Sequence, residues 1–241
     1  MTDDEKKAFE GLRAECARLR AENRQLRELL DMEVDDPPEI EVQVGDVAVT
    51  ARSSQEEKIS LFRNLFHGRE DVYPVRWESR NGRAGYSPAC AHEWNRKLCF
   101  KPRIKCGACD NRELLPVTDQ VVYGHLTGKH TIGVYPLLRD ETCRLLAVDF
   151  DKSTFLQDVE AFRKTCRLHK LPVAVERSRS GKGIHAWFFF HEPVPAELVR
   201  KFGSTLITAT TARRPEVGLE SYDRLFPSQD TIPKGGFGSL I

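Results

Sequence analysis

The sequence predicts a mixed α+β fold, in which a sheet with helices on one face follows a cysteine-rich module and an N-terminal coiled-coil helix. Three observations predict this arrangement. Apolar residues repeat in heptads before residue 31, four cysteines gather between residues 90 and 109, and strand-like and helix-like segments alternate after residue 130. The 241 residues are enough for one large domain or two small ones.

Composition excludes several classes of protein. The chain is 40% hydrophobic and 30% charged, has no apolar run near the roughly 18 residues of a membrane span, and lacks the apolar segment of a secretory signal. We therefore expect a cytoplasmic protein without a membrane partner. The net charge is +1, so any surface that binds nucleic acid must be local.

Residues 1–32 are predicted to form a coiled-coil helix. The heptad positions a and d are occupied by Phe9, Leu12, Cys16, Leu19, Asn23, Leu26 and Leu30. Leucine at d with a single asparagine at a favours a parallel two-stranded coil, so we expect a homodimer through residues 9–30. The alternative is an amphipathic helix that lies on its own domain. Residues 33–50, which include Pro37-Pro38, are predicted to form a linker.

Residues 51–115 are predicted to form a helical, zinc-binding module that packs on the core. Ser54 and Glu57 form the capping-box pattern of a helix whose apolar face is Ile59, Leu61, Phe62, Leu65 and Phe66. Four cysteines follow this helix in the sequence, and they are Cys90, Cys99, Cys106 and Cys109. Four thiolates suit a closed tetrahedral Zn²⁺ site. His92 can replace Cys90 as a ligand. The alternatives are four free thiols in a small core, or a redox pair at Cys106 and Cys109.

The cysteine-rich segment is also basic. Between Cys90 and Cys109 the single acid is Glu93, and the basic residues are Arg96, Lys97, Lys101, Arg103 and Lys105. Trp94 and Phe100 lie among them in the sequence. Cations mixed with aromatic rings suit phosphate contacts and base stacking, so we favour nucleic acid as the partner here. The alternative is an ordinary solvated charge run.

Residues 131–151 predict a β-hairpin that ends in two acids. Residues 131–138 have the pattern of a strand, 139–142 of a turn and 143–149 of the return strand. Alternate side chains share a strand face, so Asp149 and Asp151 are expected to point the same way, about 7 Å apart. A divalent cation between them would relieve their repulsion. The alternative is a strand end whose acids simply reach water.

The elements after the acids complete the sheet. Thr154 and Gln157 form a second capping-box pattern, and the helix that follows has an apolar face of Phe155, Val159, Phe162 and Cys166. Residues 173–176 are predicted as a strand, 177–184 as a glycine-rich loop, 185–190 as a strand that His185 opens, and 195–210 as a helix. This order predicts an RRM-like, ferredoxin-related sheet with helices on one face.

The loop before His185 has the chemistry of a phosphate-binding segment. It offers hydroxyls, cations and flexible backbone amides, which a triphosphate requires. The candidate nucleotide-binding residues are Arg177, Ser178, Ser180, Lys182 and His185. The loop lacks the GxxxxGK[ST] pattern and the strand-to-helix context of a P-loop. The alternative is a structural glycine turn beside a core histidine.

Three motifs in order resemble a known family. Asp149-Phe150-Asp151, the loop from Ser180 to His185, and the late acid Asp223 resemble the three motifs of archaeo-eukaryotic primase (AEP) superfamily polymerases. The phrases GVYPLL, LAVDFD, SGKGIHAWFFF and YDRLFPSQDTIPKGGFGSLI, with the cysteines upstream, are similar to the primase module of TOTE conflict systems. Those are prokaryotic defence proteins that join a primase to helicase and nuclease parts. The resemblance covers residues 55–241.

The resemblance implies a DNA primase-polymerase, which transfers nucleotides from (d)NTPs along a single-stranded DNA template, with or without a primer. It implies that Asp149, Asp151 and Asp223 hold two Mg²⁺ or Mn²⁺ ions, and that the loop residues grip the β- and γ-phosphates. The motif serine is Ser178 or Ser180. The third acid is Asp223 or Asp230, and we prefer Asp223 because it follows an aromatic residue in a predicted strand.

The resemblance also implies associated helicase and nuclease modules and an AEP catalytic core over residues 116–241. The glycine-rich C-terminal end leads us to expect that this core continues in a longer protein. Two other functions remain open. One is a DxD-dependent nuclease or glycosyltransferase, and the other is a zinc-containing nucleic-acid adaptor that is dimerised by its coil.

Overall fold

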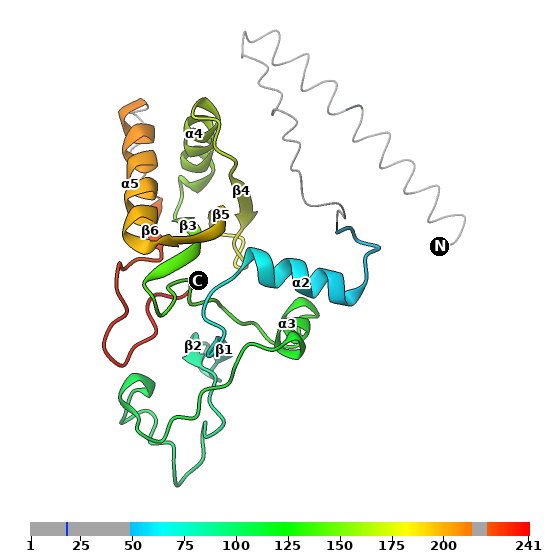
Figure 1. Cartoon of the computed structure of the whole chain (residues 1–241), viewed down its shortest axis with the longest axis vertical. Coiled ribbons are helices and arrows are strands. Elements are labelled where there is room, and N and C mark those ends of the chain that lie inside the picture. The colour runs from blue at the N-terminus through cyan, green and yellow to red at the C-terminus, as the bar shows by residue number, and fades with distance from the viewer. Residues whose placement is uncertain (1–17, 19–48, 214–220) are drawn as a thin grey trace, which may run out of the picture. The chain divides into compact units, whose positions relative to one another are not determined.

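The computed structural model describes residue 18 and residues 49–213 and 221–241 of the chain. The coiled coil and nearly all of the linker lie outside these residues, so both stay predictions. The elements below belong to the unit formed by residues 48–241 (Figure 1). None of the described helices is long and apolar enough to cross a membrane.

The main sheet has four antiparallel strands in the order β4-β5-β3-β6. The strands are β3 (Thr142–Phe150), β4 (Ala174–Arg177), β5 (Ile184–Pro195) and β6 (Tyr222–Phe226), and the helices between them are α4 (Phe155–Leu168) and α5 (Ala196–Arg213). Along the chain this is strand, helix, strand, strand, helix, strand, as in ferredoxin-like folds. The mixed α+β prediction is confirmed, and these elements occur in the predicted order.

Both helices pack on one face of the sheet (Figure 1). The alternation along β3 explains the two faces, because Leu146, Val148 and Phe150 point toward the helices. The helix side of this core includes Val159, Phe162, Val199 and Leu206. The opposite face is a smaller cluster of Leu145, Ala147, Trp187 and Phe226, against which Phe66, Phe189 and Ile241 pack. Asp149 continues this second set, so its carboxylate belongs to the face without α4 and α5.

The predicted hairpin between residues 131–138 and 143–149 is wrong. β3 pairs with β5 and β6, whereas residues 131–138 form no strand, and Ile132 makes only an isolated bridge to Val75. The backbone of this segment is bonded elsewhere, since Val134 N donates to Ile241 O (2.6 Å) and Val134 O accepts from Ile241 N (3.0 Å). β3 is buried along most of its length and therefore needs hydrogen-bond partners on both edges, which distant segments of the chain supply.

Two further helices and a small sheet precede the main sheet. They are α2 (Gln55–Leu65), α3 (Asp119–Leu126) and the antiparallel pair of β1 (Pro74–Glu78) and β2 (Ala84–Pro88), with the short 3-10 helix η1 (Cys106–Ala108) in the cysteine-rich segment. The capping box of α2 is confirmed, because Glu57 N donates to Ser54 Oγ (3.1 Å) and Ser54 N donates to Glu57 Oε2 (2.7 Å).

The second predicted capping box, at Thr154 and Gln157, does not form. The Thr154 hydroxyl donates instead to Oδ2 of the buried Asp158 (2.8 Å), and the same oxygen accepts from the hydroxyl (2.6 Å) and backbone N (3.1 Å) of Ser221. Asp158 therefore ties the residue before β6 to α4. Asp223 follows two residues later.

Residues 227–241 connect the cysteine-rich segment to the sheet. Arg112 Nη1 donates to Gly235 O at 2.9 Å. The Phe237 ring lies 5.3 Å from the Tyr135 ring and within 5.6 Å of the guanidinium carbons of Arg69 and Arg112. This ring therefore holds side chains from three separate stretches of the chain together.

Candidate active site

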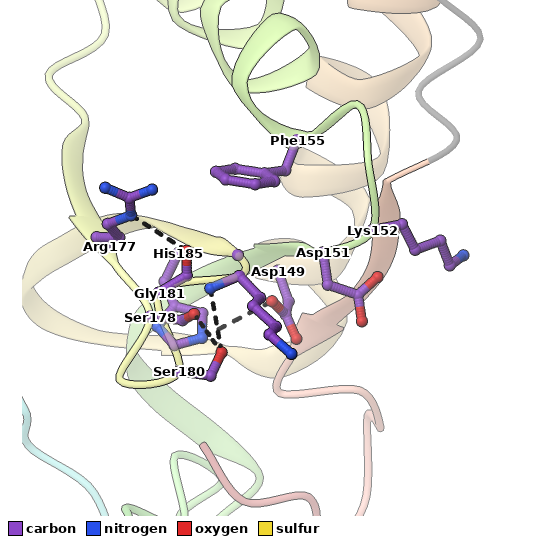
Figure 2. Close-up of a pocket in the computed structure, with 11 residues that line it drawn as sticks. Asp149, Asp151, Lys152, Phe155, Arg177, Ser178, Ser180, Gly181 and His185 are labelled. Carbon is purple, nitrogen blue, oxygen red and sulfur yellow. Dashed lines mark hydrogen bonds and ion pairs between the residues drawn. The ribbon is translucent and has the colours of Figure 1, made fainter.

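Asp149 and Asp151 lie where β3 ends (Figure 2). Asp149 is the direct partner of His185 across the β3–β5 pair, and its Oδ1 lies 3.7 Å from His185 Nε2. Asp151 N donates to Ser221 O at 2.7 Å, which fixes the end of β3 beside the start of β6. The backbone thus holds both acids at the junction of three strands.

The two acids share a cleft of about 660 Å³ with the glycine-rich loop (Figure 2). The five residues expected to bind nucleotide all line it, and they are Arg177, Ser178, Ser180, Lys182 and His185. Gly181 and Gly183 complete the loop side. The sequence motifs that were separated by more than 25 residues therefore face one cavity.

The loop is held as a tight turn by its own backbone. Ser178 N donates to Gly183 O (2.9 Å), and Gly181 N donates to Ser178 O (2.8 Å). Gly181 has φ +72°, a conformation that favours glycine. Gly183 has no room for a side chain, because a Cβ would lie 2.7 Å from Phe150 O. The second glycine therefore lets the loop lie directly against the end of β3, beside the acids.

The two candidate serines contact each other. Their Oγ atoms are 3.2 Å apart, and Ser180 Oγ also accepts a bond from Lys182 N at 3.2 Å. Arg177 Nε donates to Gly181 O (3.2 Å), which anchors this arginine at the base of the loop. Ser178 and Ser180 both line the cleft, so both remain candidates for the motif serine.

The charges around Asp149 favour a cation. Burial raises the pKa of Asp149; the charge of His185 lowers it, and the charges of Asp151 and Asp223 raise it further. Asp151 Oδ1 is buried without a hydrogen-bond partner among the described residues. A carboxylate that burial and like charges destabilise, next to one with an unsatisfied oxygen, fits a divalent cation bound by oxygen ligands.

The ligand set is not assembled in advance. Within residues 49–213 and 221–241, no group of three or more His, Cys, Asp or Glu side chains is arranged to hold a metal ion. The fit therefore rests on the electrostatics and the unsatisfied oxygen of the acid pair. Completing the site requires a further ligand, from the protein or from a bound phosphate.

The two candidates for the third acid lie in different places. Asp223 is in β6, which pairs with β3, and is close enough to raise the pKa of Asp149. Its Oδ2 accepts a bond from Arg224 Nε (2.5 Å). Asp230 instead forms an ion pair with Arg200 of α5 (2.6 Å) and lines a separate groove along that helix. Asp223 is therefore the candidate whose charge reaches Asp149, although it does not line the cleft and Arg224 is the direct strand partner of Asp149.

Sequence reasoning missed two residues that line the cleft, Lys152 and Phe155. Lys152 follows Asp151 directly and has φ +70°, and Phe155 opens α4. Phe155 was expected on the buried face of the helix, where it does pack against the core while also reaching the cleft. Lys152 directly follows the second acid in the sequence, and this adjacency was the signal that could have identified it as a cleft residue.

The cysteine-rich segment brings its thiols around one small cavity. Cys90, Cys99 and Cys109 line it together with Lys101. Burial lowers the pKa of Lys101, but its hydrogen bond to Glu93 and its proximity to Cys106 raise this pKa overall. Because Cys106 is close to Lys101, the fourth cysteine lies beside the same cavity. All four are free thiols. They do not form a preassembled metal-ligand group, and zinc stays a prediction.

His92 is a poorer ligand candidate than Cys90. Its Nδ1 lies 2.7 Å from Asn111 O and its Nε2 lies 3.1 Å from Glu113 Oε2, so both ring nitrogens are engaged. In the same segment Trp94 is 71% exposed, and the Lys101 ammonium lies 5.6 Å from the centre of its ring. The expected basic, aromatic surface is therefore on the outside of the module.

A comparison with protein families supports the resemblance seen in the sequence. The family model for the archaeo-eukaryotic primase domain of TOTE conflict systems matches residues 57–241, which include the cysteine-rich segment, the loop and all candidate acids. A search of curated proteins gives no match. The match spans well over half of the chain, and the chain belongs to the archaeo-eukaryotic primase (AEP) family of TOTE conflict systems.

Proposed function

We propose that this protein is a primase-polymerase that joins nucleotides on a single-stranded DNA template. The observation that carries the proposal is the shared cleft, in which the acid pair at the end of β3 faces the glycine-rich loop. Family membership implies nucleotidyl transfer, and a cleft with acids on one side and cations on the other suits a metal-bound triphosphate.

Each side of the cleft has a separate task in this proposal. Asp149 and Asp151, with Asp223, would hold Mg²⁺ or Mn²⁺. When bound, such ions lower the pKa of an attacking 3′-hydroxyl and neutralise charge on the phosphates. The loop opposite them donates hydrogen bonds from Ser180 and Lys182 to the phosphate oxygens, and its fixed turn holds the phosphates in one place.

His185 connects the two sides. It begins β5, its ring lies 3.7 Å from Asp149 Oδ1, and it packs edge-on against Trp187. The ring is therefore held between the acids and the loop, where it can donate a hydrogen bond to a phosphate oxygen. Fixed donors of this kind stabilise charge that develops in the transition state.

The test is incubation of the protein with a labelled primer, a single-stranded template, dNTPs or NTPs, and Mg²⁺ or Mn²⁺. We expect the primer to be extended by nucleotides complementary to the template. Products formed without a primer would show that the protein also starts new strands. Shortened primer would instead support the nuclease. Binding of the strand without any change in its length would support the adaptor.

Three further roles belong to the same proposal. The four cysteines would hold a structural Zn²⁺ ion, residues 9–30 would dimerise the chain, and helicase and nuclease modules would act with it. Sedimentation of the full chain would test the dimer, and a concentration-independent monomer would contradict it.

A further inference from the structure

The β1–β2 hairpin presents aromatic rings to solvent. Trp77 is 44% exposed and Tyr86 is 39% exposed, but the two rings lie on opposite faces of the hairpin, because Tyr86 pairs with Arg76. Trp77 and Gly85 are direct partners in the hairpin, and the indole lies over Gly85, where a Cβ would be 2.8 Å from Trp77 Cζ2. The glycine leaves room for the ring to rest on the opposite strand. An exposed ring that is held in place in this way is a stacking platform for a nucleic-acid base.

The tip of the hairpin carries positive charge. Arg80 and Arg83 are exposed, and neither side chain has an ion pair or a hydrogen bond within the part of the chain that the structure describes. The turn that carries them is fixed, because Ser79 N donates to Arg83 O (2.7 Å) and Ser79 Oγ accepts from Arg83 N (3.1 Å). Two such arginines on a fixed turn attract a polyanion.

The hairpin touches the nucleotide-binding loop. Glu78, at the end of β1, lies 3.7 Å from Arg179, which stands between Ser178 and Ser180 in the loop. Glu78 also forms an ion pair with Arg76, so this single acid of the hairpin is already neutralised. A strand that leaves the cleft therefore has the arginines and the Trp77 ring of the hairpin within reach.

We propose that the β1–β2 hairpin binds a single nucleic-acid strand beside the cleft, with Trp77 stacking on a base and Arg80 and Arg83 contacting phosphates. Charge complementarity and the contact with the loop select this occupant. If the proposed function holds, this strand is the template, and that identification rests on the proposed function. The binding of a strand to the hairpin does not rest on it.

The first experiment measures fluorescence anisotropy of a labelled oligothymidine strand with the full chain at several salt concentrations. We expect Trp77→Ala to weaken binding about 10-fold and Trp77→Phe to recover most of the loss. Arg80→Ala with Arg83→Ala should reduce the salt slope by about 1.4, which corresponds to two phosphate contacts on a single strand. Lys164→Ala, on α4 at the helix-covered face of the sheet, combined with Lys170→Ala just after that helix, removes the same charge and should change neither value.

The second experiment guards against misfolded variants, because it uses the unmodified protein. A strand that contains 5-iodouracil is photocrosslinked to the full chain, and the attached residues are mapped by mass spectrometry. We expect crosslinks at Trp77. Crosslinks confined to other residues, such as Trp94 and Phe100, would overturn the proposal, as would a wild-type chain that does not bind the strand.

The outcomes separate this inference from the proposed function. Normal primer extension with hairpin variants that bind the strand as tightly as the wild type would remove the inference alone. Crosslinking at the hairpin without any primer extension would leave the binding surface in place and remove the polymerase function.

Discussion

Asp149 and His185 are direct partners across β3 and β5, and the carboxylate Oδ1 lies 3.7 Å from the imidazole Nε2. The register of this strand pair therefore joins the acid motif to the loop motif. A slip of one residue would turn His185 toward α4 and α5, into the apolar core. The same core fixes the register, since Phe150 and Ile184 are partners in the next position and are both buried on the helix face.

We expect Asp149→Asn with Asp151→Asn to lower the rate of primer extension at least about 100-fold, because charge stabilisation at the reacting phosphate is lost. Asparagine is close to isosteric, so the variant should stay folded. The initial rate of extension and the melting curve check both points. An active double variant would exclude these acids from the chemistry.

The third acid gives a paired prediction. Asp223→Asn should lower extension as the first two acids do, because Asp223 is on the strand that pairs with β3 and its charge reaches Asp149. Asp230→Asn should retain activity, since it loses only a partly exposed ion pair with Arg200, worth about 0–1 kcal/mol. The same primer-extension assay applied to both variants decides which acid takes part. Loss of activity in Asp230→Asn alone would place the third acid beside α5.

The contrast between these two acids shows where sequence reasoning stops. The acid pair and the loop were predictable because each is a local pattern of alternating or clustered residues. The choice between Asp223 and Asp230 depends on which of them β6 carries to β3, and that pairing joins residues more than 70 positions apart. Nothing local in the sequence records it.

The two wrong predictions have the same origin. Residues 131–138 and 143–149 have the alternation of a hairpin, but the first segment bonds with Ile241 and β3 pairs with β5 and β6. Thr154 has a capping partner at the right spacing, but Asp158 offers its hydroxyl a buried acceptor that also binds Ser221. In both cases a tertiary contact replaced the local one.

Glycine at position 183 should be indispensable for a steric reason. An alanine there would place Cβ 2.7 Å from Phe150 O, so the loop must move away from the acids, at a cost of about 1–3 kcal/mol. Activity should fall with it. Gly181→Ala is the control, because nothing lies within 4 Å of its Cβ position and only the strain of its φ, about 1–2 kcal/mol, is added. Equal activity losses in the two variants would contradict the close approach at Gly183.

Asp71 gives a prediction for stability against pH. The hydrogen bonds of its carboxylate to Arg69 (2.9 and 2.5 Å) hold the pKa of Asp71 well below its usual range; burial opposes this, and Arg139 adds to it. The folded protein therefore favours the ionised form, so this stabilisation is present above the unfolded pKa of about 3.9 and is lost as the pH falls below it.

We expect Asp71→Asn to lower the free energy of unfolding by about 1–2 kcal/mol at pH 7, because the buried Arg69 loses a charged partner. The difference from the wild type should shrink as the pH falls below about 4. Urea unfolding at several pH values measures it. A difference that stays constant down to pH 3 would show that the carboxylate charge is not its cause.

The cysteines give the last prediction, which concerns metal content. Cys106→Ser with Cys109→Ser should remove a structural zinc ion, because a closed site needs about four ligands and these two lie on the knuckle around η1. Elemental analysis of the purified chain measures zinc, and chelation should lower the melting temperature of the wild type but not of the variant. Cys166→Ala is the control. Burial raises the pKa of the Cys166 thiol to about 12, so it stays protonated on the buried face of α4 and provides no thiolate for a metal. Zinc that persists in the double variant would show that Cys106 and Cys109 are not its ligands. Zinc that is absent from the wild type would contradict the zinc site itself.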